Sequence, residues 1–216
     1  MHRIAFIALL VVTSLAVGCA GRSAPGISRE QQEQASAYLA DGGKYFEQQK
    51  YHKAADAYEK AIKIDPGDAY AYYYLASSYD RLQMPDEAIA SYQQAILLKP
   101  DDALFHYDLG ATYLRHKRFD EAARAFGEAV KINPSFSQAY YGMGWIFAET
   151  GNYEQAAADY RRAIEADPNN ARAHYALGSV SIICGDFTAA QKEYEILLDL
   201  DPTGAEELLS RIRKNK

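Results

Sequence analysis

Aromatic side chains with a polar tip recur through this 216-residue chain at a constant interval of 34 residues. This tyrosine series consists of Tyr73, Tyr107, Tyr141 and Tyr175. Trp145, the only tryptophan, follows Tyr141 by four residues, which places both rings on one face of a helix. Such rings offer a large contact area at low entropic cost, and they therefore indicate recognition of a peptide. An equally open interpretation is that the tyrosine rings pack against neighbouring segments of the chain.

The other polar residues do not form a catalytic or metal-binding pattern. The histidines are scattered and no pair has the spacing of metal ligands; they are His2, His52, His106, His116 and His174. No nucleophile stands beside a base, and the G-x-G fragment at Gly142 lies within a predicted helix rather than in a phosphate-binding loop. We therefore expect a protein that is not an enzyme and that binds neither a metal nor a cofactor.

Residues that determine helix ends and helix packing recur at the same interval of 34 residues. Prolines recur at this interval, at Pro66, Pro100, Pro134, Pro168 and Pro202. Twelve residues before each proline stands an alanine, and eight before it an aromatic residue; these aromatic residues are Tyr58, Tyr92, Phe126, Tyr160 and Tyr194. A third column is small: Gly42, Ala76, Gly110, Gly144 and Gly178. Each unit holds two stretches of helical periodicity separated by a breaker, which predicts five helical hairpins with these columns as their core.

Each unit resembles a tetratricopeptide repeat, a family whose pattern has this period. The units span 35–68, 69–102, 103–136, 137–170 and 171–204. The resemblance implies an all-α fold, a right-handed superhelical α-solenoid, over residues 28–204. Ser28 and Gln31 form a capping-box pattern that predicts an early start of the first helix, near Arg29. Residues 205–216 place Leu208, Leu209 and Ile212 on one helical face and predict a C-terminal capping helix.

In repeats of this kind the ligand lies on the concave face, which is lined by the first helix of each unit. The resemblance places the tyrosine series and Trp145 there, together with Arg81 and Arg115, which would form a cationic centre opposed by Asp80 and Asp108. We therefore expect a groove that binds an extended segment or a helix of another protein.

The first 18 residues follow a different pattern. Arg3 is followed by an apolar stretch and then by small residues, as in a secretory signal peptide. The segment that ends at Cys19 resembles a bacterial lipobox, which implies cleavage before Cys19 and lipidation of that residue. Residues 19–27 would then form a flexible tether. By the sorting rule of Gram-negative lipoproteins, Ala20 implies an outer-membrane lipoprotein that faces the periplasm.

Charge and the second cysteine add two expectations. The formal charge is −6, with acids and bases interspersed, which argues against nucleic acid as a partner. Cys184 is interpreted as a small buried apolar residue. Ile182 and Ile183 would form an apolar patch that the capping helix covers in part or in full.

These observations predict a non-catalytic scaffold that is anchored to the bacterial outer membrane and binds an envelope protein. Lipoproteins that resemble it include pilotins of type IV pili and secretins, and adaptors of peptidoglycan hydrolases. An alternative of a different class is a glycan- or muropeptide-binding module in which the tyrosines stack on sugar rings. The sequence leaves these alternatives open.

Overall fold

The computed structural model of the chain describes residues 26–215. The predicted signal peptide, Cys19 and most of the predicted tether lie outside the described residues. The described part contains helices and no strand. The helices are α1 (Arg29–Glu47), α2 (Tyr51–Ile64), α3 (Ala69–Arg81), α4 (Pro85–Leu98), α5 (Ala103–Arg115), α6 (Phe119–Ile132), α7 (Ser137–Glu149), α8 (Tyr153–Ala166), α9 (Ala171–Ile183), α10 (Phe187–Leu200) and α11 (Pro202–Asn215). The prediction of an all-α solenoid is confirmed.

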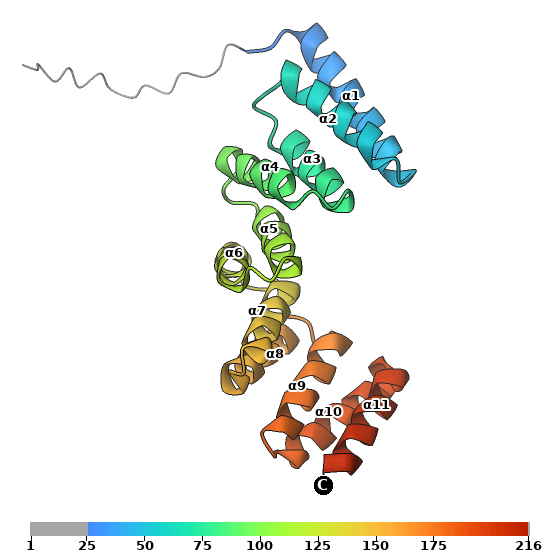
Figure 1. The fold of residues 1–216 in the computed structure, drawn as a ribbon, viewed down its shortest axis with the longest axis vertical. Coiled ribbons are helices and arrows are strands. Elements are labelled where there is room, and N and C mark those ends of the chain that lie inside the picture. Colours follow the sequence, from blue (N-terminus) through green and yellow to red (C-terminus); the bar gives the residue numbers. More distant parts are fainter. Residues whose placement is uncertain (1–25, 216) are drawn as a thin grey trace, which may run out of the picture.

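Consecutive helices pair into hairpins, and the hairpins stack from α1 at one end to α11 at the other (Figure 1). Each unit supplies one odd-numbered and one even-numbered helix. The odd-numbered helices α5, α7 and α9 also contact one another directly. They thus form a continuous face along the stack.

Local side-chain chemistry fixes where the helices begin and end. Ser28 and Gln31 form the predicted capping box, and α1 begins at Arg29 as expected. Asp68 and Asp102 accept hydrogen bonds from backbone N–H groups in the first turns of α3 and α5. Each even-numbered helix ends two residues before the repeated proline, because proline disfavours helical geometry in the residue before it.

The turn between the two helices of each unit uses a residue with positive φ at the same repeat position. Gly151 and Gly185 occupy this position in the last two units, with φ near +79° and +78°. In the first three units it is held by Gln49, Gln83 and Lys117, with φ of 57° to 59°. The hairpin geometry is therefore constant although glycine is present in only two of the five turns.

The predicted core columns pack as expected. The five repeated alanines are fully buried; they are Ala54, Ala88, Ala122, Ala156 and Ala190. The repeated aromatic is at most 2 % exposed in the first four units. Small residues are needed opposite these rings: a Cβ at Gly42 would lie 2.5 Å from Tyr58, and one at Gly144 would lie 2.7 Å from Tyr160. Contact between the two helices of a hairpin thus depends on the small column.

The fifth unit closes the stack differently. Its aromatic residue, Tyr194, is only half-buried. Leu208 of α11 takes up the space beside Gly178, where an added Cβ would lie 2.6 Å from the leucine side chain. Leu208 and Ile212 are buried against α9 and α10, which confirms the capping helix. The helix begins at Pro202, three residues earlier than predicted, because proline is well tolerated in the first turn.

The expectation that Cys184 is buried is wrong. Cys184 is the C-cap residue of α9, directly before the left-handed Gly185, and its thiol is exposed. The neighbouring isoleucines differ from each other: Ile182 is buried beneath α11, whereas Ile183 remains 53 % exposed. The capping helix therefore covers only one of them.

Candidate functional site

Two cavities open on the face formed by the odd-numbered helices, which we call the groove face. The N-terminal cavity, about 1030 Å³, lies between α1, α3 and α5. The central cavity, about 540 Å³, lies between α5, α7 and α9. Six of the seven predicted groove residues line these cavities: Tyr73 and Arg81 the first, Tyr107, Tyr141 and Trp145 the second, and Arg115 both. The prediction that these positions share one face agrees with this geometry.

Three aromatic rings form the walls of the central cavity, and a fourth forms its floor. Tyr107, Tyr141 and Trp145 line the walls. Phe126 belongs to the core column and is 1% exposed, but it also lines the bottom of this cavity beside Gly142. A Cβ at Gly142 would lie 2.7 Å from the ring of Phe126. The glycine therefore lets the buried ring of Phe126 approach α7 closely, and the floor of the cavity consists of this ring and of backbone that carries no side chain.

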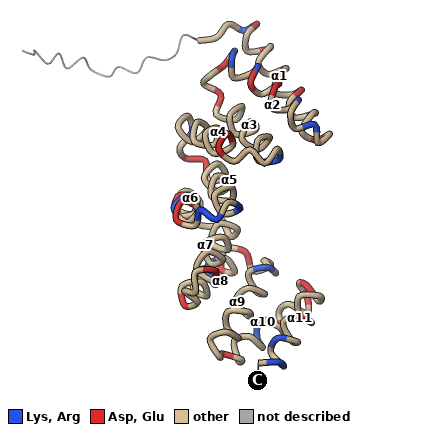
Figure 2. Tube along the Cα trace, in the orientation of Figure 1, with Lys and Arg blue, Asp and Glu red and all other residues tan. Residues whose placement is uncertain are grey.

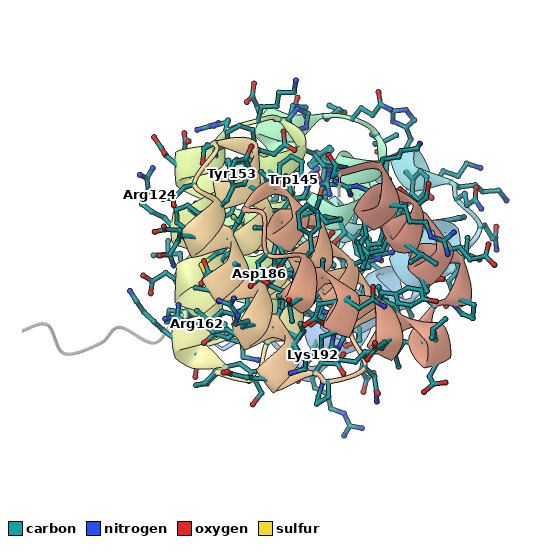
Figure 3. All side chains as sticks on the ribbon, turned by 90° about the horizontal axis from the view of Figure 1, so that it is seen from below. Arg124, Trp145, Tyr153, Arg162, Asp186 and Lys192 are labelled. Atoms are coloured by element: carbon teal, nitrogen blue, oxygen red, sulfur yellow. The ribbon has the colours of Figure 1, made fainter. Side chains whose placement is uncertain are left out.

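The rings of the central cavity are held in place by neighbours. Trp145 meets Phe119 edge-on at 6.0 Å between ring centroids. The ring centroid of Tyr107 lies 4.9 Å from the ring centroid of Phe136. Seen along the stack, Trp145 lies nearer the middle of the molecule, whereas Arg124 of α6 points outward at the periphery (Figure 3). The anchor rings are thus pre-positioned, which lowers the entropic cost of binding a ligand.

Polar groups lie at the rim of the central cavity. Arg172 enters from the start of α9 and forms no ion pair with another described residue. Burial raises the pKa of the Tyr107 hydroxyl, and the nearby guanidinium groups of Arg172 and Arg115 offset part of that rise. Gln138 and Asn169 contribute amide groups to the lining. Asp167 also lines the cavity, so the rim is polar and carries charges of both signs around an apolar interior.

The N-terminal cavity has a different character because carboxylates reach into it. Tyr73 donates its hydroxyl to Oδ2 of Asp108 at 2.6 Å. Asp80 accepts from Arg115 at 2.5 Å and from Thr112 at 2.8 Å. Arg115 is therefore already neutralised by Asp80. The predicted cationic centre at Arg81 and Arg115 is reduced to Arg81, an exposed residue at the rim.

Tyr175 has a different environment from the other tyrosines of its series. Its hydroxyl donates to Glu207 of α11 and accepts from Arg211 at 3.3 Å. Arg211 also donates to Ser179 at 2.6 Å. The capping helix therefore covers the groove face at Tyr175, and this residue lines neither cavity.

Three tyrosines of the series pack against the core, as one of the two interpretations expected, and they also line the cavities. Tyr73, Tyr107 and Tyr141 each pack against the core aromatic of their own unit, with centroid distances of 5.6–5.8 Å. The same three rings line a cavity. The hydroxyls of Tyr107 and Tyr141 form no hydrogen bond with the described residues, whereas those of Tyr73 and Tyr175 do. The central pair thus keeps polar groups available to a ligand.

Three features of the site were not predicted from the sequence. Phe126 was assigned only to the core, and Arg172 was not singled out. Asp108 was taken as a counter-charge to the arginines, but its hydrogen bond is to Tyr73. A signal for Arg172 existed, because it lies on the first helix of the fifth unit, and the resemblance assigns the first helices to the ligand-binding face.

No group of three metal-ligating side chains occurs within residues 26–215. No helix in that range is both long enough and apolar enough to span a bilayer. Lysines and arginines are interspersed with acids along the described chain, without a continuous basic stripe in that part (Figure 2).

The comparisons with known proteins agree with this geometry. Sequence models described as tetratricopeptide repeat match residues 70–101, 107–171 and 141–205, and a model described as TPR repeat matches 42–83 and 86–117. The chain belongs to the tetratricopeptide repeat family. Repeats of this family form scaffolds for protein–protein interaction and are generally non-catalytic. No curated protein matches the chain in sequence.

Solved structures share the fold over most of the chain. MamA is 25% identical, with a TM-score of 0.70 over 76% of this chain and 96% of its own. PilW, described as a widely conserved type IV pilus biogenesis factor, is 24% identical with a TM-score of 0.70 over 84% and 85%. YrrB, described as a TPR protein with an unusual peptide-binding site, is 22% identical with a TM-score of 0.67 over 84% and 94%. PilW and YrrB show the fold alone.

Proposed function

We propose that this chain is a protein-binding scaffold of the bacterial envelope that holds an extended segment of another protein along its groove face. The central cavity carries this proposal, because three aromatic rings held by their neighbours line a space of about 540 Å³ on the groove face. Aromatic side chains in such a setting supply much of the binding energy at protein interfaces. The free hydroxyls of Tyr107 and Tyr141 and the rim amides would bond the backbone of the bound segment.

The proposal includes attachment of the scaffold to the outer membrane through lipidated Cys19. The support is the sequence pattern around Cys19, which resembles a lipobox. A short tether would keep the groove near the membrane surface, where it meets envelope proteins. Mass spectrometry of the chain isolated from its native envelope tests this part: an unmodified Cys19 in a chain that retains residues 1–18 would contradict it.

Among envelope pathways, assembly of type IV pili or secretins is the first that we would test. PilW shares the fold over 84% of this chain, and its description as a pilus biogenesis factor motivates the choice. In a strain that lacks the gene, loss of secretin multimers from the outer membrane would support a pilotin-like role. Normal secretin assembly with altered peptidoglycan turnover would instead favour an adaptor of cell-wall hydrolases.

The binding site itself is tested with a library of random dodecapeptides displayed on phage and selected against the purified full-length chain in detergent. Selected peptides should lose binding when Tyr141 or Trp145 is changed to alanine. Tyr140→Ala is the matched control, because Tyr140 precedes Tyr141 on the same helix and lines neither cavity. Circular dichroism establishes that each variant retains its helices. Peptides that bind all three variants equally would contradict the proposal.

A further inference from the structure

The N-terminal cavity contains a carboxylate without a cationic partner. Oδ2 of Asp108 accepts the hydroxyl of Tyr73, and its other oxygen accepts no hydrogen bond from the described residues. No lysine, arginine or histidine among these residues lies within ion-pair distance of Asp108, whereas neighbouring Asp80 is paired with Arg115. Burial raises the pKa of the Asp108 carboxyl, as does the charge of Asp80, while Tyr73 and Arg115 lower it in part. A cation close to Asp108 would stabilise the charged form of this carboxyl group.

Five aromatic rings form a large part of the remaining walls of this cavity. Tyr58, Tyr73, Tyr74 and Tyr92 line it together with Phe46. Tyr74 is 44% exposed, and its ring centroid lies 5.3 Å from that of Tyr73. Ammonium and guanidinium groups are attracted to the faces of such rings, and their long aliphatic stems pack well along them. The ring-lined walls thus suit the same kind of ligand as the carboxylate.

The other charged groups of the cavity do not supply that cation. Arg115 is committed to Asp80, and Arg81 and Glu47 are exposed at the rim with opposite signs. The cavity lining carries three acids, including Asp80 and Asp108, against two arginines. The acids and arginines of the lining therefore sum to a negative formal charge.

We propose that the N-terminal cavity binds a lysine or arginine side chain of the partner segment, with Asp108 as its counter-ion and Tyr73 and Tyr74 as its aromatic walls. This inference rests on the proposed function, because it assumes that a polypeptide occupies the groove face. It adds the chemistry that the partner must present. The partner segment carries a basic residue near α3 and an apolar residue at the central cavity.

The test is a double-mutant cycle on a peptide selected from the phage library. Selected peptides should be enriched in lysine or arginine at one position. Asp108→Asn keeps the acceptor for Tyr73 but removes the charge, and it should weaken binding of such a peptide about tenfold or more. Replacing the peptide's basic residue with glutamine should weaken binding to the original chain equally, and should have little further effect on the Asp108→Asn chain. Asp101→Asn removes an equal charge from an exposed loop and should leave binding unchanged.

The outcomes separate the inference from the proposed function. Peptides that need Tyr141 and Trp145 but lack a basic residue would overturn the inference and leave the groove as the binding site. Additive effects of Asp108→Asn and the glutamine substitution would overturn it as well. A selection that yields no peptide dependent on Tyr141 or Trp145 would contradict the proposed function itself. Urea unfolding of the Asp108→Asn chain ensures that a loss of binding does not reflect unfolding.

Discussion

Gly142 offers a test of how tightly α7 packs against the core ring of Phe126. The ring of Phe126 lies between Gly110 of α5 and Gly142 of α7, and it is only 1% exposed. A Cβ at Gly142 would lie 2.7 Å from Cε2 and 2.8 Å from Cζ of the ring. A Cβ at Gly110 would lie 2.8 Å from Cδ1 and Cε1, on the other edge. The ring therefore has no room to retreat from either position.

Two opposing contributions determine the effect of Gly142→Ala on the free energy of unfolding. Alanine is favoured over glycine within a helix by about 1 kcal/mol. Carbon atoms pack best at about 3.5–4.0 Å, so the new methyl group would overlap the ring by roughly 0.8 Å. Overpacking of this kind costs about 1–3 kcal/mol. We therefore expect a net destabilisation of about 1 kcal/mol, in spite of the better helix former.

Gly127→Ala is the matched control for this prediction. Gly127 lies within α6, and a Cβ there would meet no atom within 4 Å. It should stabilise the chain by about 0.5–1 kcal/mol, because only helix propensity changes. Urea unfolding followed by circular dichroism gives the midpoints of both variants. If Gly142→Ala raised the midpoint as much as Gly127→Ala, the argument that Phe126 is confined would be refuted. In a Phe126→Leu background, the cost of Gly142→Ala should shrink.

Two further substitutions test other parts of the packing. Asp159 is 1% exposed and contacts Arg162 at 3.0 Å, and burial raises its pKa although Gln155 and Arg162 partly counter this. Because the pKa of Asp159 is raised in the folded chain, the folded chain loses stability as the pH rises from the ordinary pKa of 3.8 through the raised value. Asp159→Asn should therefore stabilise the chain at neutral pH, and this gain should disappear below pH 3.8. Thermal unfolding of both chains across pH measures the difference. Leu208→Ala removes a fully buried side chain of α11 and should cost about 3 kcal/mol. Because a repeat contacts only its neighbours, hydrogen exchange should accelerate in α9–α11 and remain unchanged in α3–α6; uniform acceleration would contradict this view of the stack.

The fold was predictable because the same contact between the two helices recurs in the first four units. A buried ring on the second helix needs a small residue on the first, and the two columns recur together through four units. The fifth unit departs from this rule: Leu208 lies beside Gly178, and Tyr194 is only half-buried. The start of α11 was misplaced because Pro202 was interpreted only as the end of a helix, although proline also suits a first turn.

The turns and Cys184 show where sequence reasoning failed and why. Gln49, Gln83 and Lys117 adopt a left-handed conformation that carries no sequence signal, since glycine is the residue expected there. Cys184 was judged by its residue type, which is often buried. Its repeat position held better information, because Gln48, His116 and Thr150 occupy the same column and are exposed. A position that ends a helix beside a left-handed residue faces solvent in most units.

The two cavities differ because one column of the repeat varies while the backbone around it does not. At the sixth position of the first helix the chain carries Tyr74, Asp108 and Gly142 in successive units. The first two place a ring and a carboxylate in the N-terminal cavity, and the third adds no side chain to the central cavity, whose floor is the ring of Phe126. Since the cavities follow one another along the stack, a segment that fills both would be bound in one direction only. Its basic residue would lie toward α1 and its apolar residue toward α9, so the peptides that bind should keep these two residues in a constant order.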